Sequence, residues 1–299
     1  LEAEGSVFLS RTDSEVAAHL LNKYYDGDLL YAMKMTVGKL RGSYALMAVC
    51  KGENKIVDAC NKSPLIIGYG FGENYCASDE PALAGKCETI VVMEDGDLAE
   101  ITAESVAVYN CEMQSVIREP EPNLAVSADM STGDCPHYML KEIREVPESV
   151  LSTKRAFSGI ADKFKTAVSG AKRIIMTGCG TAYHAALIGK RYFESFASIP
   201  VEVETAGEFR YKDPLINEDT VLFAISQSGE TADTVEAARL ARSRGAKIVA
   251  VTNSHRSQLN RIADIVVPVA AGPEICVAAT KSYTGQITAL YLCALAFAG

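Results

Sequence analysis

Two features that mark membrane and nucleic-acid-binding proteins are missing from this chain of 299 residues. The final apolar run, residues 289–298, has about half of the roughly 20 residues that a membrane-spanning helix needs. The Lys and Arg residues are scattered within a net charge of −9 and form no basic stripe with aromatic residues. We therefore expect neither a membrane span nor nucleic-acid binding.

The chain also lacks the cysteine and histidine spacings that typify disulfide frameworks and metal centres. Its nine cysteines are odd in number and widely spaced, include no C-x-x-C pair, and lie mostly inside apolar runs. This distribution is typical of reduced, buried thiols in a cytoplasmic protein. The four histidines form no ligand-spaced cluster: His19, His137, His184 and His255. The sequence thus predicts no metal site and no cofactor.

The chain has enough hydrophobic residues, 48%, to form a substantial core. Its length accommodates two domains. Residues 6–9 are predicted to form a strand. A capping box at residues 12–15 predicts a helix to about residue 25, and a second helix follows over residues 29–40. Seven β-type runs separated by turns then predict an antiparallel sheet that these helices cover on one side: residues 44–50, 55–59, 65–70, 75–78, 89–93, 98–101 and 106–110.

The second part of the chain has a different order of predicted strands and helices. Residues 113–136 predict a linker or an extended wrapping segment, and residues 137–157 a helix. Five apolar runs then alternate with helical segments and predict a doubly wound parallel sheet: residues 173–177, 201–204, 220–225, 247–252 and 265–269. Ligands of such sheets bind beyond the carboxyl ends of the strands. Three loops are therefore expected to face one crevice: residues 178–181, 226–231 and 272–274.

The loop at residues 226–231 carries three hydroxyl groups, an amide and a glycine immediately before a helix. Backbone N–H groups at such a helix start bind phosphate through neutral donors and the helix dipole. Because no Lys follows Gly229, the loop is not a nucleotide P-loop. Ser and Thr are also the commonest N-cap residues, so the loop by itself fits a capped helix equally well.

Several segments together resemble one family. Residues 178–183 and 226–234 resemble the two sugar-phosphate loops of the SIS (sugar isomerase) fold. Across the whole chain, further segments in the same order resemble the glutamine–fructose-6-phosphate aminotransferases (isomerising), or glucosamine-6-phosphate synthases: residues 11–16, 40–44, 72–79, 137–143, 206–211 and 274–281. The resemblance spans two unrelated fold types, which makes it more specific than any single loop.

The resemblance implies a fold and a set of site residues. Residues 1–112 would be the back half of a glutaminase domain, a truncated α+β sandwich of the N-terminal-nucleophile type. Residues 113–136 would be a linker, and residues 137–299 the first SIS domain, an α/β domain with a five-stranded parallel sheet. Asp13 would be a remnant of the glutamine-binding site. The sugar phosphate would be held by Ser226, Gln227, Ser228 and Thr231, and the sugar lined by Thr181, Ala182 and Val277.

One residue departs from the family pattern, because Ala182 stands where the family often has Ser. We expect weaker binding at that corner of the site.

The family makes glucosamine 6-phosphate from fructose 6-phosphate and glutamine, so these sugar phosphates and, in the complete enzyme, glutamine are the expected partners. An N-terminal-nucleophile hydrolase needs Cys, Ser or Thr at residue 1, where this chain has Leu1. In the family, the isomerisation relies on a Glu, a His and a Schiff-base Lys from a second SIS domain and the C-terminal tail. The sequence therefore predicts a fragment without catalytic residues, inactive alone, whose unpaired SIS surface favours a homo-oligomer.

Four alternative functions compete with the one that this resemblance implies. Gly178 and Gly180 after a strand suggest a nicotinamide-dependent dehydrogenase, but Tyr183 occupies the position of the third glycine of that fingerprint. A non-catalytic SIS sugar-phosphate sensor and a deglycase-like relative are both disfavoured. Neither class of protein needs residues 1–112, which resemble part of a glutaminase domain. Cys179 precedes a helix start that would lower the pKa of a nucleophilic thiol, yet no His lies at an obvious partner position.

Overall fold

The computed structural model describes residues 1–123, 131–254 and 256–299. Part of the predicted linker, residues 124–130, and His255 lie outside these ranges. The chain divides into two compact units, Leu1–Asp129 and Met130–Gly299, called unit 1 and unit 2 here. The domain limits at residues 112 and 137 stay a prediction. None of the helices in the described ranges combines the length and apolar character needed to span a membrane.

Unit 1 opens with a short 3-10 helix and two α-helices: η1 (Glu2–Glu4), α1 (Asp13–Tyr24) and α2 (Leu29–Val37). The two predicted helices are confirmed, but the strand predicted over residues 6–9 is wrong. The N–H groups of Leu9 and Ser10 donate to the Glu15 carboxylate, at 2.6 and 2.7 Å, and not to a neighbouring strand. Because the Glu15 carboxylate accepts these two hydrogen bonds, it does not serve the predicted capping box. Thr12 is still the N-cap residue, although its side chain caps no N–H group of the described chain.

The seven β runs predicted in unit 1 all form strands, and two shorter strands follow: β1 (Tyr44–Val49), β2 (Ile56–Asn61), β3 (Ile66–Tyr69), β4 (Asn74–Ala77), β5 (Thr89–Val92), β6 (Leu98–Ile101), β7 (Val106–Tyr109), β8 (Ser115–Val116) and β9 (Glu121–Pro122). A second 3-10 helix, η2 (Glu80–Leu83), lies between β4 and β5. The strands build two antiparallel sheets, and not the single sheet predicted. Their orders are β1-β2-β6-β7-β8 and β4-β3-β5-β9.

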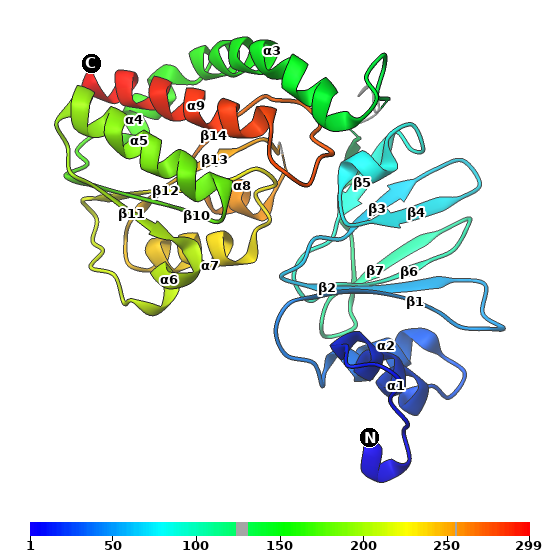
Figure 1. The fold of residues 1–299 in the computed structure, drawn as a ribbon. Coiled ribbons are helices and arrows are strands. Elements are labelled where there is room, and N and C mark those ends of the chain that lie inside the picture. Colours follow the sequence, from blue (N-terminus) through cyan, green and yellow to red (C-terminus); the bar gives the residue numbers. More distant parts are fainter. Residues whose placement is uncertain (124–130, 255) are drawn as a thin grey trace. The chain divides into compact units, whose positions relative to one another are not determined.

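The two sheets of unit 1 and helices α1 and α2 lie in successive layers (Figure 1). One buried apolar cluster lies between the two sheets, a second packs the first sheet against α1 and α2, and a third lies on the other face of the second sheet, beside η2. Successive side chains of a strand point to opposite faces. Strand β2 accordingly sends Val57 and Ala59 to the helices, and Asp58 and Cys60 toward the second sheet. The predicted covering of one side of the sheet by the two helices is confirmed.

Unit 2 begins with two helices and then alternates strands with helices: α3 (Tyr138–Ser158), α4 (Ala161–Val168), β10 (Arg173–Gly178), α5 (Thr181–Ala197), β11 (Val201–Thr205), α6 (Ala206–Tyr211), β12 (Thr220–Ser226), α7 (Ala232–Ser243), β13 (Lys247–Thr252), α8 (Gln258–Ile262), β14 (Ile265–Pro268) and α9 (Lys281–Ala298). The five strands form one parallel sheet, as predicted, and their order is β11-β10-β12-β13-β14. Helices α3, α4, α5 and α9 cover one face, and α6, α7 and α8 the other (Figure 1).

The central strand β12 shows why this sheet could be predicted. All seven of its residues are buried, because helices cover both faces of the sheet. The strand order reverses between β10 and β12, since β11 lies on one side of β10 and the later strands on the other. Ligand-binding crevices of such sheets open at the carboxyl ends of the two strands where the order reverses.

Candidate functional site

The turn after β10 brings two strand ends close together. A Cβ atom added to Gly178 would lie 2.9 Å from the carbonyl oxygen of Ile225 on β12, so a side chain there would push the strand ends apart. Gly180 has a φ of +57°, in the left-handed region that favours glycine. Helix α5 starts directly afterwards. The turn thereby places exposed Thr181 and buried Ala182 at the point of strand-order reversal.

The loop after β12 is folded by its own hydroxyl groups. The Oγ of buried Ser226 lies 2.9 Å from Oγ1 of Thr231 and accepts a hydrogen bond from the N–H of Gly229 at 3.0 Å. The hydroxyl of Ser228 accepts from the N–H of Glu230 at 3.1 Å. The loop is therefore a tight turn built mainly from neutral groups.

Thr231 is the N-cap residue of α7, but its side chain makes no capping hydrogen bond within the described chain. Its hydroxyl faces Ser226 across the loop instead. The first N–H groups of a helix have no intrahelical partner. The side-chain cap required by the capped-helix interpretation is therefore missing in the described residues, which weakens that interpretation.

The same loop is fixed to the start of α8. Gly229 has a φ of +70°, and a Cβ atom added to it would lie 2.1 Å from the Oγ of Ser257. The Glu230 carboxylate accepts hydrogen bonds from the backbone N–H and the side-chain amide of Gln258, both at 2.9 Å. Glu230 therefore anchors the loop to α8, a contact that its sequence position did not predict.

Asn253 joins the loop after β12 to the loop between β14 and α9. Its N–H donates to the carbonyl of Gln227 at 3.0 Å. Its side-chain oxygen accepts from the N–H of Ala271 at 2.8 Å, and its amide donates to the carbonyl of Gly272 at 2.7 Å. Two of the three predicted loops are thus connected by a residue that sequence analysis missed. Its position directly after β13, at the carboxyl edge of the sheet, was the available signal.

The other predicted residues take no part in the hydrogen bonds of Asn253. Val277 is fully exposed in the loop between β14 and α9. Asp13 is an exposed residue at the start of α1, in unit 1. The Sγ of Cys179 lies 3.9 Å from Oγ1 of Thr234, which links the loop after β10 to α7.

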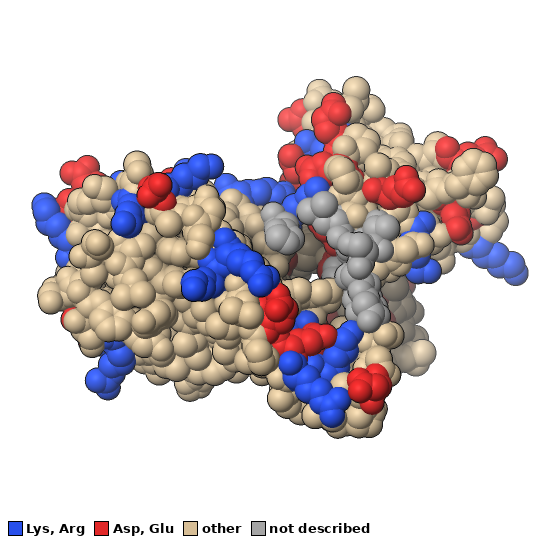
Figure 2. All heavy atoms as spheres, turned by 90° about the horizontal axis from the view of Figure 1, so that it is seen from above, with Lys and Arg blue, Asp and Glu red and all other residues tan. Residues whose placement is uncertain are grey.

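Charged side chains near these loops are paired with one another. Arg210 on α6 donates to Asp233 in the first turn of α7 at 2.7 Å. Buried Lys281, at the start of α9, lies 2.5 Å from Glu145 on α3. Figure 2 shows acidic and basic side chains interspersed over the face in view. A ligand at the loops would therefore meet chiefly hydroxyl, amide and N–H groups.

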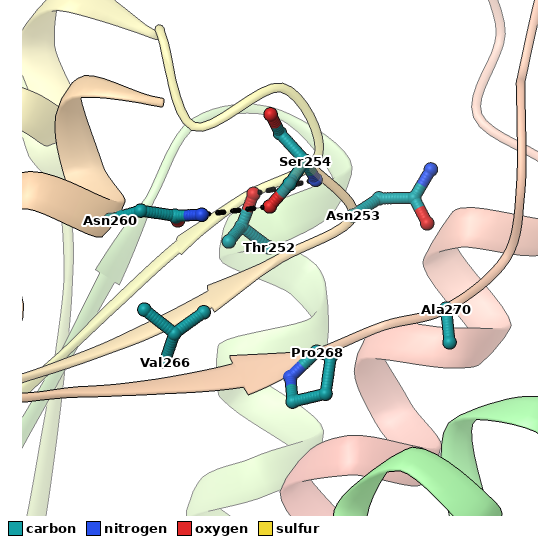
Figure 3. A pocket seen from close by; sticks show the side chains of 7 residues that line it. All are labelled: Thr252, Asn253, Ser254, Asn260, Val266, Pro268 and Ala270. Atoms are coloured by element: carbon teal, nitrogen blue, oxygen red, sulfur yellow. Dashed lines mark hydrogen bonds between the residues drawn. The ribbon is translucent and has the colours of Figure 1, made fainter. Parts of the chain in front are cut away.

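A hollow of about 330 Å³ lies beyond the carboxyl ends of β13 and β14 (Figure 3). On one wall, the side-chain amide of Asn260 donates to the carbonyl of Ser254 at 2.9 Å, and the N–H of Ser254 donates to the Thr252 hydroxyl at 3.1 Å. Seven residues line it: Thr252, Asn253, Ser254, Asn260, Val266, Pro268 and Ala270. The predicted sugar-phosphate residues lie outside this lining.

Residues 167–296 match the family model of the SIS domain. A solved structure described as the C-terminal domain of glucosamine-fructose-6-phosphate aminotransferase from Francisella tularensis is similar to this chain, with a TM-score of 0.54 and 37% identity. That match covers 56% of this chain and 50% of the other. Together with the parallel sheet, these matches define unit 2 as a SIS domain.

Curated relatives match along the whole chain. The glutamine–fructose-6-phosphate aminotransferase (isomerizing) of Symbiobacterium thermophilum is 44% identical over 310 residues, which cover 99% of this chain and 50% of the relative. That of Aquifex aeolicus is 42% identical and covers 97% of this chain and 49% of its own length. The chain is thus similar to these aminotransferases along nearly its whole length, and it spans about half the length of the curated relatives it matches.

Proposed function

We propose that unit 2 binds a hexose 6-phosphate, either fructose 6-phosphate or glucosamine 6-phosphate, at the loops that follow β10, β12 and β14. The observation that carries the proposal is the loop at residues 226–231. It lies at the point of strand-order reversal, it carries three hydroxyl groups, and it precedes a helix whose first N–H groups have no side-chain cap among the described residues. The names of the relatives supply the identity of the sugar.

The proposal assigns a binding role to each predicted residue. The phosphate is held through Ser226, Gln227, Ser228 and Thr231, and the sugar is bordered by Thr181, Ala182 and Val277. Because the donors are neutral, the dipole of α7 supplies the favourable potential for the phosphate charge. Buried Ala182 offers no hydroxyl, so the α5 corner binds through backbone groups and Thr181 alone.

The wider activity is also proposed. The chain would be part of an enzyme that makes glucosamine 6-phosphate from fructose 6-phosphate and glutamine, with unit 1 as part of its glutaminase domain and Asp13 near the glutamine. By itself it would form no product, and it would associate with copies of itself. The relatives' names support the proposed reaction. The predicted inactivity is supported by the loops of the site, because their groups suit binding rather than proton transfer. Product formation by the purified chain would contradict the predicted inactivity.

Titration calorimetry tests the binding proposal. The unaltered chain is expected to bind glucosamine 6-phosphate saturably and to bind neither glucosamine nor NAD. Thr231→Ala removes a hydroxyl of the loop and should weaken the affinity about tenfold. Ser243→Ala, at the exposed far end of the same helix, is the matched control and should leave it unchanged. Binding of NAD, or equal binding by both variants, would contradict the proposal.

A further inference from the structure

The loop between β14 and α9, residues 269–280, forms no helix or strand, yet it is attached at both ends. At its start, Ala271 and Gly272 bond to Asn253, which in turn bonds to the carbonyl of Gln227 in the candidate phosphate loop. The position of this loop is therefore coupled to that of residues 226–231 through a continuous chain of hydrogen bonds.

The second attachment is a single carboxylate from a distant helix. Glu142 on α3 is only 2% exposed. Its Oε1 accepts hydrogen bonds from the N–H groups of Ile275 and Cys276, at 2.7 and 3.0 Å. Its Oε2 lies 2.6 Å from the hydroxyl of Thr280. Three donors of the loop thus converge on one side chain.

A second carboxylate within the loop reinforces this arrangement. Glu274 accepts from the N–H groups of Thr280 and Ser282, both at 3.0 Å, and so fixes the entry into α9. The Thr280 hydroxyl also lies 2.9 Å from Glu274, and it can donate to only one of the two carboxylates at a time. The N–H bonds to Glu142 are therefore the ones that hold residues 275 and 276 in place.

We infer that Glu142 is a positioning residue for sugar-phosphate binding: it holds residues 275–277 at the crevice while Asn253 ties the same loop to the phosphate loop. The inference rests on the proposed function. Glu142 contacts the loop backbone and acts on the ligand only through the placement of Val277 and its neighbours. Its removal should therefore affect the sugar part of a ligand more than the phosphate part, which residues 226–231 hold.

Affinity for glucosamine 6-phosphate and for inorganic phosphate, measured side by side, tests this inference. Glu142→Ala leaves the loop N–H groups without their acceptor, and should weaken glucosamine 6-phosphate binding about tenfold while phosphate binding stays within about twofold. Glu142→Gln retains an oxygen that can accept from both N–H groups, and should restore most of the affinity. Glu148→Ala is the matched control, because Glu148 is an exposed residue of the same helix that pairs with Arg155 and Ser152 and not with the loop before α9.

Each outcome bears on a different claim. Equal losses for both ligands, or no rescue by Gln, would show that Glu142 merely supports the fold and would overturn the inference. Unchanged affinity in Glu142→Ala, beside weakened binding in Thr231→Ala, would overturn the inference and leave the proposed function standing. Absence of binding by the unaltered chain would overturn both. Should the Ala variant fail to fold, Glu142→Asp shortens the side chain, moves the acceptor away from both N–H groups and should weaken glucosamine 6-phosphate binding about threefold; unchanged binding would contradict the inference.

Discussion

Each unit of the chain contains a carboxyl group that is almost completely removed from water, and the two groups behave in opposite ways. Asp58 in unit 1 is 0% exposed and Glu142 in unit 2 is 2% exposed. Neither oxygen of Asp58 has a hydrogen-bond partner in the described part of the chain. Burial raises its pKa to about 6, and the neighbouring Cys76 thiol acts in the opposite direction.

Burial also opposes ionisation of Glu142, but hydrogen bonds outweigh it. The hydroxyl of Thr280 and the N–H groups of Cys276 and Ile275 lower the pKa of this carboxyl below its ordinary value. The comparison teaches that burial does not fix the charge of a carboxyl group, because the donors around it decide the direction of the pKa shift. An ionised Glu142 serves as an anchor, whereas Asp58 is a source of instability.

The largest expected effect comes from removing the anchor. Glu142→Leu leaves the N–H groups of Ile275 and Cys276 without their acceptor and should lower the free energy of unfolding of unit 2 by about 3 kcal/mol. Native-state hydrogen exchange of the β12 amides measures this. A change below about 1 kcal/mol would show that the loop finds other acceptors and that Glu142 anchors nothing.

The next effect concerns Asp58. Its folded-state pKa lies above its ordinary value, so between about pH 4 and 6 the folded state holds more protons than the unfolded state, and stability falls as the pH rises. The free energy of unfolding of unit 1 should fall by about 3 kcal/mol across this pH window. In Asp58→Asn it should change little with pH over the same window. Hydrogen exchange of the β2 amides at several pH values distinguishes them. Parallel pH profiles would mean that Asp58 has a partner.

A smaller effect of opposite sign is expected for Glu142. Because its folded-state pKa is lowered, its stabilisation is present above its ordinary pKa and is lost as the pH falls through the folded-state value. Unit 2 should therefore lose stability in acid, and Glu142→Gln should lose less. The β12 amides again provide the measurement. A loss on raising the pH from 4 to 7 would contradict the assigned direction.

The smallest effect is on thiol reactivity. Burial, followed by the negative charge of Asp58, raises the pKa of Cys76 to about 12. An alkylating reagent at pH 8 should therefore modify exposed Cys111 well before Cys76. Mass spectrometry of the labelled peptides gives the two rates. Equal rates would place Cys76 in a more open environment.

Sequence patterns predicted those features that depend on neighbouring residues. The five parallel strands were predictable because strands buried on both faces are continuous apolar runs, as β12 shows. The loop at residues 226–231 was predictable because a strand, a Ser/Thr-rich turn and a helix follow one another. The strand at residues 6–9 was predicted wrongly, since an apolar run reveals nothing about whether a partner strand exists.

Other features depend on residues far apart in the chain. Glu142 and Ile275 are separated by 133 positions, so no local pattern marks Glu142 as an anchor. The two sheets of unit 1 were predicted as one because the strand lengths and turns do not encode which strands pair. Asn253 was overlooked because a single amide after a strand carries no distinctive spacing. These residues gain their roles only from the topology of the sheet.

The central claim is that the loop after β12 binds the phosphate of a hexose 6-phosphate, and backbone amide NMR of the unaltered chain tests it most directly. Titration with glucosamine 6-phosphate should shift the amide signals of residues 226–231 most, with a second group at residues 178–182, and inorganic phosphate should shift only the first group. Shifts confined to the hollow around Asn260 and Pro268, or no shifts at all, would contradict the account.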